Sequence, residues 1–240
     1  MQSTVLAVHR ETPDTVRITL AAPGFTFFPG QFIMLRTQIE GKTIQRSYSV
    51  ASSPNGKTVE TAIKEQHPGT FSTYAQQLKT GDELELLGPF GKHFVMPLDQ
   101  LTTDSHVVLI AGGSGITPYR SFLQAAANAS SPAKFTLIFS VKTGEDVIFK
   151  DDLAVFSQTL NLQTIVTLTR PTTHDLHGHK GLFGRITKKT IADSLGADLT
   201  TIRFYVCGPT AMVVDTVDTL YKLGVEKGSI LFEKFGSISD

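Results

Sequence analysis

The pattern of hydrophobic and polar positions changes once along the chain, near residues 97–104. Before this point most apolar segments are short, and several alternate apolar and polar residues with the period of two that half-buried strands show. Gly and Pro turns separate these segments. About six short strands with such turns predict a small antiparallel barrel, interrupted by one helix at residues 71–78. The predicted strands include residues 15–20, 32–35, 45–50, 58–63 and 83–86.

After residue 104, continuous apolar strands alternate with amphipathic helices. The predicted strands are residues 106–111, 135–139, 162–168, 203–207 and 230–232, and the predicted helices are 118–128, 149–156, 187–195 and 210–223. Thr187 is the predicted N-cap of the third of these helices, and Gly224 is the predicted end of the last. Alternation of strand and helix predicts a doubly wound parallel α/β sheet. We therefore expect two domains, an antiparallel β-barrel at residues 1–102 and an α/β domain at residues 103–240.

Composition excludes several classes of function. Lys plus Arg and Asp plus Glu number 22 each, so no excess of positive charge favours nucleic acid or an anionic membrane. Residues 1–4 lack the pattern of a signal peptide, and the apolar run 107–111 is too short to span a bilayer. We therefore expect no membrane span and, by default, a cytoplasmic location. The single cysteine, Cys207, excludes both an intrachain disulfide and a cysteine-held iron–sulfur cluster in this sequence.

The most informative stretch of the first half is Arg46-Ser47-Tyr48-Ser49. The planar guanidinium of Arg46 suits a phosphate. Tyr48 follows two residues later, on the same side of an extended chain, and offers a ring face to a flat heterocycle. The hydroxyl of Ser49 both donates and accepts hydrogen bonds. Together they suit a phosphorylated flavin, although an ordinary amphipathic strand would show the same residue types.

A second candidate site precedes the helix of the first half. Residues 69–72 place glycine and hydroxyl side chains at the helix start, where free N–H groups attract an anion. The alternative is that Thr70 or Ser72 simply caps the helix. The turn Gly88-Pro89-Phe90-Gly91 ends this half, and a plain turn explains it as well as a ligand does.

Two loops of the second half follow predicted strands. Ligands of doubly wound sheets bind at the carboxyl ends of the strands. Residues 112–118, with the sequence GGSGITP, join the first of these strands to its helix, and glycines let the backbone approach a pyrophosphate. The spacing departs from G-x-G-x-x-G, and no acidic residue ends the next strand. Cys207-Gly208-Pro209 also ends a strand and opens a helix, although a free cysteine is commonly a small core residue.

These motifs, together with Glu233-Lys234-Phe235, resemble in order and spacing those of the ferredoxin–NADP reductase superfamily over nearly the whole chain. The resemblance implies a flavin-binding barrel followed by a pyridine-nucleotide domain. It implies catalytic roles for Ser49 at flavin N5, for Cys207 and for Glu233. The implied flavin ligands are Arg46, Tyr48, Ser49, Ile63, Lys64, Gly69, Thr70, Phe71, Ser72 and Phe235. The implied NAD(P) ligands are Gly112, Gly113, Ser114, Gly115, Ile116, Thr117, Cys207, Gly208 and Pro209.

The resemblance implies that NAD(P)H gives hydride to bound FAD, with FMN as the alternative cofactor. Electrons then pass to a separate acceptor such as ferredoxin, flavodoxin or an oxygenase component. Two other hypotheses stay open, an NAD(P)H-dependent free-flavin reductase and a flavin-holding or nucleotide-sensing subunit of a larger electron-transfer complex. Ser140, Lys142 and Arg170 favour NADP(H) slightly over NAD(H). Phe235 is followed by residues 236–240, which departs from the family's closing aromatic residue.

The histidine-rich stretch His174-Asp175-Leu176-His177-Gly178-His179 contains residue types that bind metals. It forms no helical i, i+4 pair and follows a Pro-Thr-Thr segment. We interpret it as a solvated loop and predict no metal site.

Overall fold

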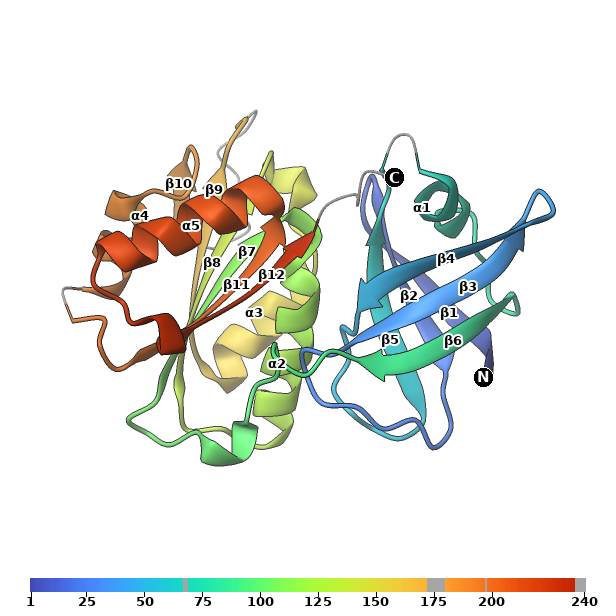
Figure 1. The fold of residues 1–240 in the computed structure, drawn as a ribbon, viewed down its shortest axis with the longest axis horizontal. Coiled ribbons are helices and arrows are strands. Elements are labelled where there is room, and N and C mark those ends of the chain that lie inside the picture. Colours follow the sequence, from blue (N-terminus) through green and yellow to red (C-terminus); the bar gives the residue numbers. More distant parts are fainter. Residues whose placement is uncertain (67–68, 172–179, 197, 236–240) are drawn as a thin grey trace. The chain divides into compact units, whose positions relative to one another are not determined.

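The computed structural model describes residues 1–66, 69–171, 180–196 and 198–235 (Figure 1). The chain divides into two compact units. One unit contains Met1–Met96 and Thr117–Ala125, and the other contains Pro97–Ile116 and Ala126–Asp240. Helix α2 (Thr117–Asn128) therefore begins in the first unit and ends in the second. The domain limit between residues 102 and 103 stays a prediction.

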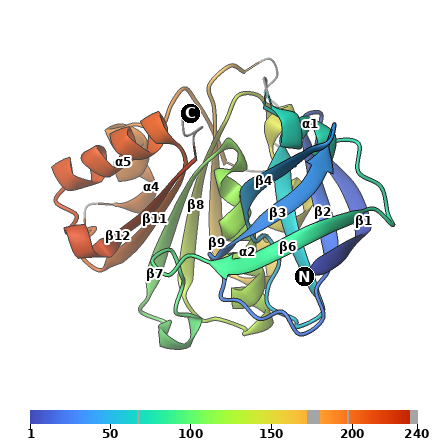
Figure 2. The same ribbon diagram turned by 45° about the vertical axis from the view of Figure 1, so that its right-hand side comes forward.

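The first unit is a six-stranded antiparallel barrel, as predicted (Figures 1 and 2). Its sheet order is β4-β3-β6-β1-β2-β5. The strands are β1 (Gln2–Thr12), β2 (Thr15–Ala21), β3 (Phe32–Ile39), β4 (Lys42–Ser49), β5 (Thr58–Lys64) and β6 (Glu83–Phe90). Alternate residues such as Val16, Ile18 and Leu20 of β2 fill the interior. Helix α1 (Thr70–Ala75) contacts β3, β4 and β5.

A tight turn sets the register of β3 and β4. Glu40 and Gly41 both have positive φ angles, 50° and 76°, and Ile39 pairs with Lys42. Two successive positive φ angles match the twist of an antiparallel hairpin. This register fixes which residues of β4 share a face, and hence the placement of Arg46, Tyr48 and Ser49.

The barrel departs from the predicted elements in two places. Strand β1 was not predicted, because register shifts between Val5 and Ala7 and between Arg10 and Thr12 interrupt its alternation. The predicted helix 71–78 is wrong in its bounds, since α1 covers Thr70–Ala75. Leu78 had indicated a longer helix, but it is buried in the barrel core from the segment that follows α1.

The second unit is a six-stranded parallel sheet, as predicted, with the order β10-β9-β8-β7-β11-β12. Its strands are β7 (His106–Gly112), β8 (Lys134–Val141), β9 (Asn161–Leu168), β10 (Lys180–Phe183), β11 (Ile202–Pro209) and β12 (Ile230–Phe235). Helices α4 (Lys188–Leu195) and α5 (Thr210–Lys222) pack on one face through Ile191, Val213 and Leu220. Helix α3 (Lys150–Thr159) lies on the other face (Figure 1).

The order of the parallel sheet reverses between β7 and β11. From β7 the chain builds outward through β8, β9 and β10, then crosses to the other side of β7 with β11 and β12. In doubly wound sheets such a reversal leaves a crevice at the carboxyl ends of the two diverging strands. The fold therefore makes the ends of β7 and β11 a candidate ligand site.

Several bounds in this unit also differ from the prediction. The short strand β10 was not predicted, and β12 continues three residues beyond Phe232, so that Glu233 and Phe235 lie in a strand. Helix α3 starts at Lys150 because Phe149 adopts a left-handed conformation with φ 61°. The predicted N-cap of α4 is confirmed, since Thr187 Oγ1 accepts the N–H of Thr190 at 3.1 Å.

None of the helices in the described part of the chain has the length and apolar character that a membrane crossing requires. Among the described residues, no three His, Cys, Asp or Glu side chains are grouped to hold a metal ion. The stretch His174–His179 lies outside the described residues.

Candidate functional site

The edge strand β4 presents the predicted cation, ring and hydroxyl together. Arg46 is exposed, and its Nη1 donates to the Gln45 carbonyl at 2.8 Å. Tyr48 is half-buried, with its ring centroid 5.6 Å from that of Phe71 on α1. Burial raises the pKa of Tyr48, and the nearby Arg46 opposes this only in part, so the phenol stays neutral. Ser49 is buried and closes the strand.

Strand β5 contains two further predicted flavin ligands, Ile63 and Lys64, and both already have partners within the protein. The Ile63 carbonyl accepts Gln76 Nε2 at 3.1 Å, and Ile63 is fully buried. Lys64 Nζ lies 2.6 Å from Asp14 Oδ2. The ammonium of Lys64 is thus paired with a carboxylate, so a contact of Lys64 with a ligand would involve its backbone.

The start of α1 is shaped by a glycine. The N-cap residue is Gly69, so the alternative that Thr70 or Ser72 is the N-cap is wrong. Among the described residues no side chain caps this helix, and its first turn contains no acidic residue. A Cβ at position 69 would overlap the Gln66 carbonyl and Ser72 Oγ. The glycine therefore permits a close turn that leaves the first N–H groups of α1 suited to an anion.

Three glycines bring the ends of β7 and β11 into close contact. A Cβ at Gly208, where φ is +150°, would lie 3.0 Å from the Gly112 nitrogen. A Cβ at Gly115 would overlap the Cys207 carbonyl. The 3-10 turn η2 (Gly113–Ile116) that follows β7 therefore rests directly on the end of β11. This places the two predicted nucleotide loops side by side at the point where the sheet order reverses.

Cys207 and Glu233 are neighbours in register on β11 and β12. Cys207 is fully buried, and burial together with the nearby Glu233 raises the pKa of its thiol well above the ordinary value. The thiol is therefore neutral, and its burial agrees with the alternative of a core cysteine. Burial raises the pKa of Glu233 to about 7, so this half-buried carboxyl exchanges its proton near neutral pH.

The structure brings the predicted residues together in two groups. In the first unit, Arg46, Tyr48 and Ser49 lie along β4, and Phe71 of α1 packs on Tyr48. In the second unit, the two glycine loops adjoin Cys207, whose partner in register is Glu233. Phe235 is half-buried and pairs in register with Pro209. Phe90, in the turn Gly88-Pro89-Phe90-Gly91, packs on Phe32, with the two ring centroids 5.6 Å apart.

Sequence reasoning missed a set of polar residues that surround the segment after Ser49. They are Ser52, Glu60, Thr61, Arg120, Ser121 and Gln124. Arg120 carried one signal, because it is the only charged residue in the sequence of α2, TPYRSFLQAAAN. Charged side chains are rarely fully buried unless they are paired, so a partner could have been expected.

A barrel strand that carries a cation, a ring and a hydroxyl, and two glycine loops at the reversal point of a parallel sheet, are typical of one class of protein. It is the class of flavin-dependent oxidoreductases that use a pyridine nucleotide. The residues present fit a flavin and a pyridine nucleotide. Strand β4 carries a surface cation and an aromatic ring for the flavin, and β7 and β11 end in close-packed glycine backbone for the nucleotide.

Comparison with known proteins agrees with this class. Residues 4–95 match the family model of the oxidoreductase FAD-binding domain, and residues 109–218 match that of the oxidoreductase NAD-binding domain. One of the subunits of the 1,2-phenylacetyl-CoA epoxidase of Escherichia coli is 32% identical, over 98% of this chain and 67% of its own length. The chain spans 42% and 54% of the length of two other curated relatives.

Two solved structures are similar over nearly the whole of this chain. A ferredoxin NADP⁺ reductase from Neisseria gonorrhoeae with bound FAD and NADP is 27% identical, with a TM-score of 0.82 and 98% coverage of both chains. The ferredoxin reductase in carbazole 1,9a-dioxygenase is 28% identical, with a TM-score of 0.82 over 98% of this chain and 69% of that one. The chain belongs to the ferredoxin–NADP reductase superfamily. It is an NAD(P)H-dependent flavoprotein oxidoreductase with an FAD-binding and an NAD-binding domain.

Proposed function

We propose that this chain is an electron-transfer reductase that serves a separate protein acceptor, namely a ferredoxin, a flavodoxin or an oxygenase component. The observation that carries the proposal is the match over 98% of the chain to a protein named as a subunit of an epoxidase. The structural relative named as a ferredoxin reductase in a dioxygenase supports the same role. With a single cysteine, these 240 residues hold no cysteine-ligated iron–sulfur cluster, so the next electron carrier lies outside them.

The proposed flavin site uses the residues of β4, β5 and α1. Arg46 binds the pyrophosphate, Tyr48 packs against the ring system, and the N–H groups of residues 69–72 hold phosphate oxygens. Ser49 donates a hydrogen bond to N5, Ile63 and Lys64 contribute backbone contacts, and Phe235 covers the ring. Bound FAD supplies the capacity to accept a hydride and to release electrons one at a time. The protein orients the flavin and the nicotinamide relative to each other.

The proposed nucleotide site uses the two loops at the ends of β7 and β11. Backbone of residues 112–117 binds the pyrophosphate, and residues 207–209 border the nicotinamide. Glu233, with its pKa raised to about 7, is placed to hold or release a proton during turnover. Cys207 acts as a neutral thiol that shapes this border.

We also propose a preference for NADPH over NADH. Lys142 and Arg170 follow neighbouring strands β8 and β9, and the Arg170 N–H donates to the Lys142 carbonyl at 2.8 Å. Two cations on adjoining loops, near Ser140 at the end of β8, suit a 2′-phosphate. A cytoplasmic location stays a prediction of the composition.

The first experiment is a visible absorbance spectrum of the desalted protein, recorded under argon before and after NADPH or NADH. A flavin spectrum that NADPH bleaches at lower concentration than NADH supports the proposal. A colourless protein that oxidises NAD(P)H only after flavin is added supports the free-flavin reductase instead. A bound flavin that neither nucleotide bleaches favours the subunit hypothesis and contradicts hydride transfer.

The acceptor is tested by mixing the NADPH-reduced protein with one candidate at a time. We would use a [2Fe–2S] ferredoxin, a flavodoxin and free FMN, and follow each absorbance change in a stopped-flow spectrometer. Rapid one-electron reduction of ferredoxin or flavodoxin, at least tenfold faster than that of free FMN at equal concentration, supports a protein acceptor. Equal or faster reduction of FMN contradicts it.

A further inference from the structure

The segment Ser49–Ser53, which begins with the serine proposed to face flavin N5, is held by hydrogen bonds at every residue. On its inner side, the Ser49 carbonyl accepts Thr61 Oγ1 at 2.8 Å. The Val50 N–H donates to the Gln31 carbonyl at 3.0 Å, and the Ala51 N–H donates to the Glu60 carbonyl at 2.7 Å. All five residues of the segment are buried.

Helix α2 holds the other side of the same segment. Arg120 Nη1 donates to the Ala51 carbonyl at 3.1 Å, and Ser121 Oγ donates to the Ser52 carbonyl at 2.7 Å. The Ser53 N–H donates to Gln124 Oε1 at 2.7 Å. The three helix residues are i, i+1 and i+4, and therefore lie within about 100° of one another around the axis of α2. Three consecutive residues of an irregular segment are thus bonded to one helix.

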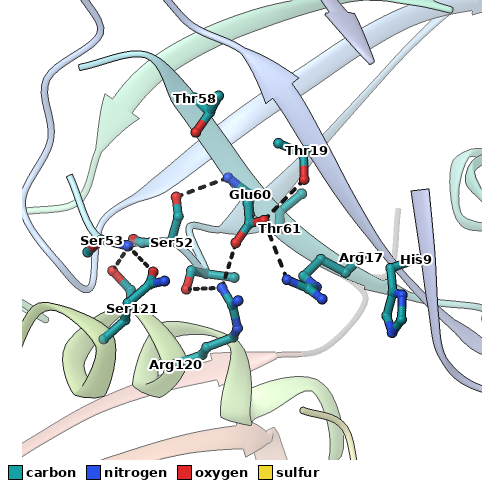
Figure 3. Close-up of polar contacts among 12 residues, drawn as sticks. His9, Arg17, Thr19, Ser52, Ser53, Thr58, Glu60, Thr61, Arg120 and Ser121 are labelled. Atoms are coloured by element: carbon teal, nitrogen blue, oxygen red, sulfur yellow. Dashed lines mark hydrogen bonds and ion pairs between the residues drawn. The ribbon is translucent and has the colours of Figure 1, made fainter. Parts of the chain in front are cut away.

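An ion pair between the buried Arg120 and the half-buried Glu60 also joins this helix to the barrel. Arg120 Nη1 lies 2.6 Å from Glu60 Oε2, and the Arg120 side chain is only 4% exposed. The other carboxylate oxygen of Glu60 accepts Thr19 Oγ1 at 3.1 Å and lies 3.4 Å from Arg17 Nη1. Figure 3 shows Arg120 reaching from α2 to Glu60, with Ser121 beside Ser52 and Ser53. A hydrogen-bonded buried pair of this kind specifies one geometry, because other arrangements leave a charge unpaired.

The helix that makes these contacts starts at Thr117, directly after the glycine turn η2. The part of α2 that makes these contacts, up to Gln124, belongs to the same unit as the barrel, so the segment that follows Ser49 is held within one unit. We propose that Arg120, through its pair with Glu60, is a positioning residue for hydride transfer: it holds Ser49–Ser53 in place through α2. The proposal rests on the proposed role of Ser49.

The test compares Arg120→Met with a double variant, Glu60→Gln/Arg120→Met, in the FAD-loaded protein. Arg120→Met leaves the Glu60 carboxylate without its closest cation, so it lowers Tm. The double variant removes both charges and recovers most of that Tm. Flavin reduction at saturating NADPH, however, stays at least tenfold slower in both variants, with KM changed less than twofold. A reduction rate that recovers together with Tm would overturn the proposal.

Hydrogen–deuterium exchange supplies a readout that does not depend on activity. We expect about tenfold faster exchange of the amides of residues 50–53 in both variants, and unchanged exchange in β3. Ser121→Ala, which keeps the ion pair, raises exchange in the same segment by a smaller factor and serves if Arg120→Met does not fold. Unchanged exchange at residues 50–53 in Arg120→Met, the double variant and Ser121→Ala would contradict the proposal.

The matched control is Glu85→Gln. It removes the negative charge from the ion pair that Arg36 and Glu85 form across β3 and β6, where both side chains are about one-third exposed. This variant loses one barrel ion pair without touching α2, so the reduction rate and the exchange at residues 50–53 stay at wild-type values. Failure of NADPH to bleach the wild-type flavin would contradict the proposed function. Even then, exchange at residues 50–53 still measures whether Arg120 and α2 hold the segment Ser49–Ser53.

Discussion

At the scale of single residues, Glu233 makes the chain's stability depend on pH. Its pKa is about 7 in the folded chain, against 4.5 for an unburied glutamate. Below pH 4.5 both states hold the proton. Between pH 4.5 and 7 an unfolded glutamate loses its proton while the folded carboxyl still holds it, so stability is lost over this window, by up to about 3 kcal/mol, and changes no further above pH 7.

Glu233→Gln removes this loss, because an amide does not titrate. Between pH 5 and pH 8, Tm of the FAD-loaded wild type without nucleotide should fall by several degrees more than Tm of the variant. Differential scanning fluorimetry at both pH values measures the difference. Parallel curves for the two proteins would show that burial does not raise this pKa.

Gly115 is a second residue whose surroundings fix its identity. A Cβ there would overlap the Cys207 carbonyl and lie 2.8 Å from Gly208 Cα, both of which are backbone atoms of β11. Gly115→Ala must therefore push η2 off β11 and disturb the proposed nucleotide loop. We expect kcat/KM for NADPH to fall about 100-fold, or ~2.7 kcal/mol of transition-state stabilisation, while FAD content is unchanged. Gly228→Ala is the control, because a Cβ at that position would have no other atom within 4 Å. Equal kinetics in the two variants would contradict the tight packing of η2.

At the scale of elements, capping of α4 gives a stability prediction independent of the site. Thr187 Oγ1 accepts the Thr190 N–H, and the Thr190 hydroxyl accepts the Thr187 N–H at 3.2 Å. Thr187→Ala loses this reciprocal cap and should destabilise the protein by about 1 kcal/mol, whereas Thr187→Ser keeps it. Urea unfolding of the three proteins measures the difference. The same loss in the serine variant would assign the effect to the methyl group rather than to the cap.

Elements were predictable where their period was regular and their ends carried a chemical signal. Helix α4, with Thr187, and strand β2, with its strict alternation, are of this kind. Strand β1 was missed because two register shifts break its period. Strand β10 has only four residues and pairs with a single neighbour, β9, so too few positions carry a pattern. The length of α1 was misjudged because Leu78 is buried for tertiary reasons.

At the scale of the whole molecule, the sequence located the proposed ligand-facing residues but not their supports. Arg46, Tyr48 and Ser49 lie within four residues, so their spacing on a strand already relates them. Glu60 and Arg120 are 60 residues apart and meet only when the barrel and α2 are both folded. On the strand, Glu60 reads as an ordinary solvent-facing charge. Long-range polar pairs of this type leave no periodic signal in one sequence.

The last prediction concerns the route of electrons through the whole protein. If every electron enters as a hydride next to Ser49, then Ser49→Ala should slow flavin reduction by NADPH about 10- to 100-fold, the value of one lost hydrogen bond of ~1.4 to 2.7 kcal/mol. When the acceptor is in enough excess that flavin reduction limits turnover, steady-state reduction of a protein acceptor should slow by the same factor, because no second route feeds it. Ser47→Ala is the control, since Ser47 is exposed on the same strand. Stopped-flow flavin bleaching and acceptor reduction, measured in one preparation, provide both rates. An acceptor rate that Ser49→Ala leaves unchanged would show that electrons bypass this serine, as the subunit hypothesis requires.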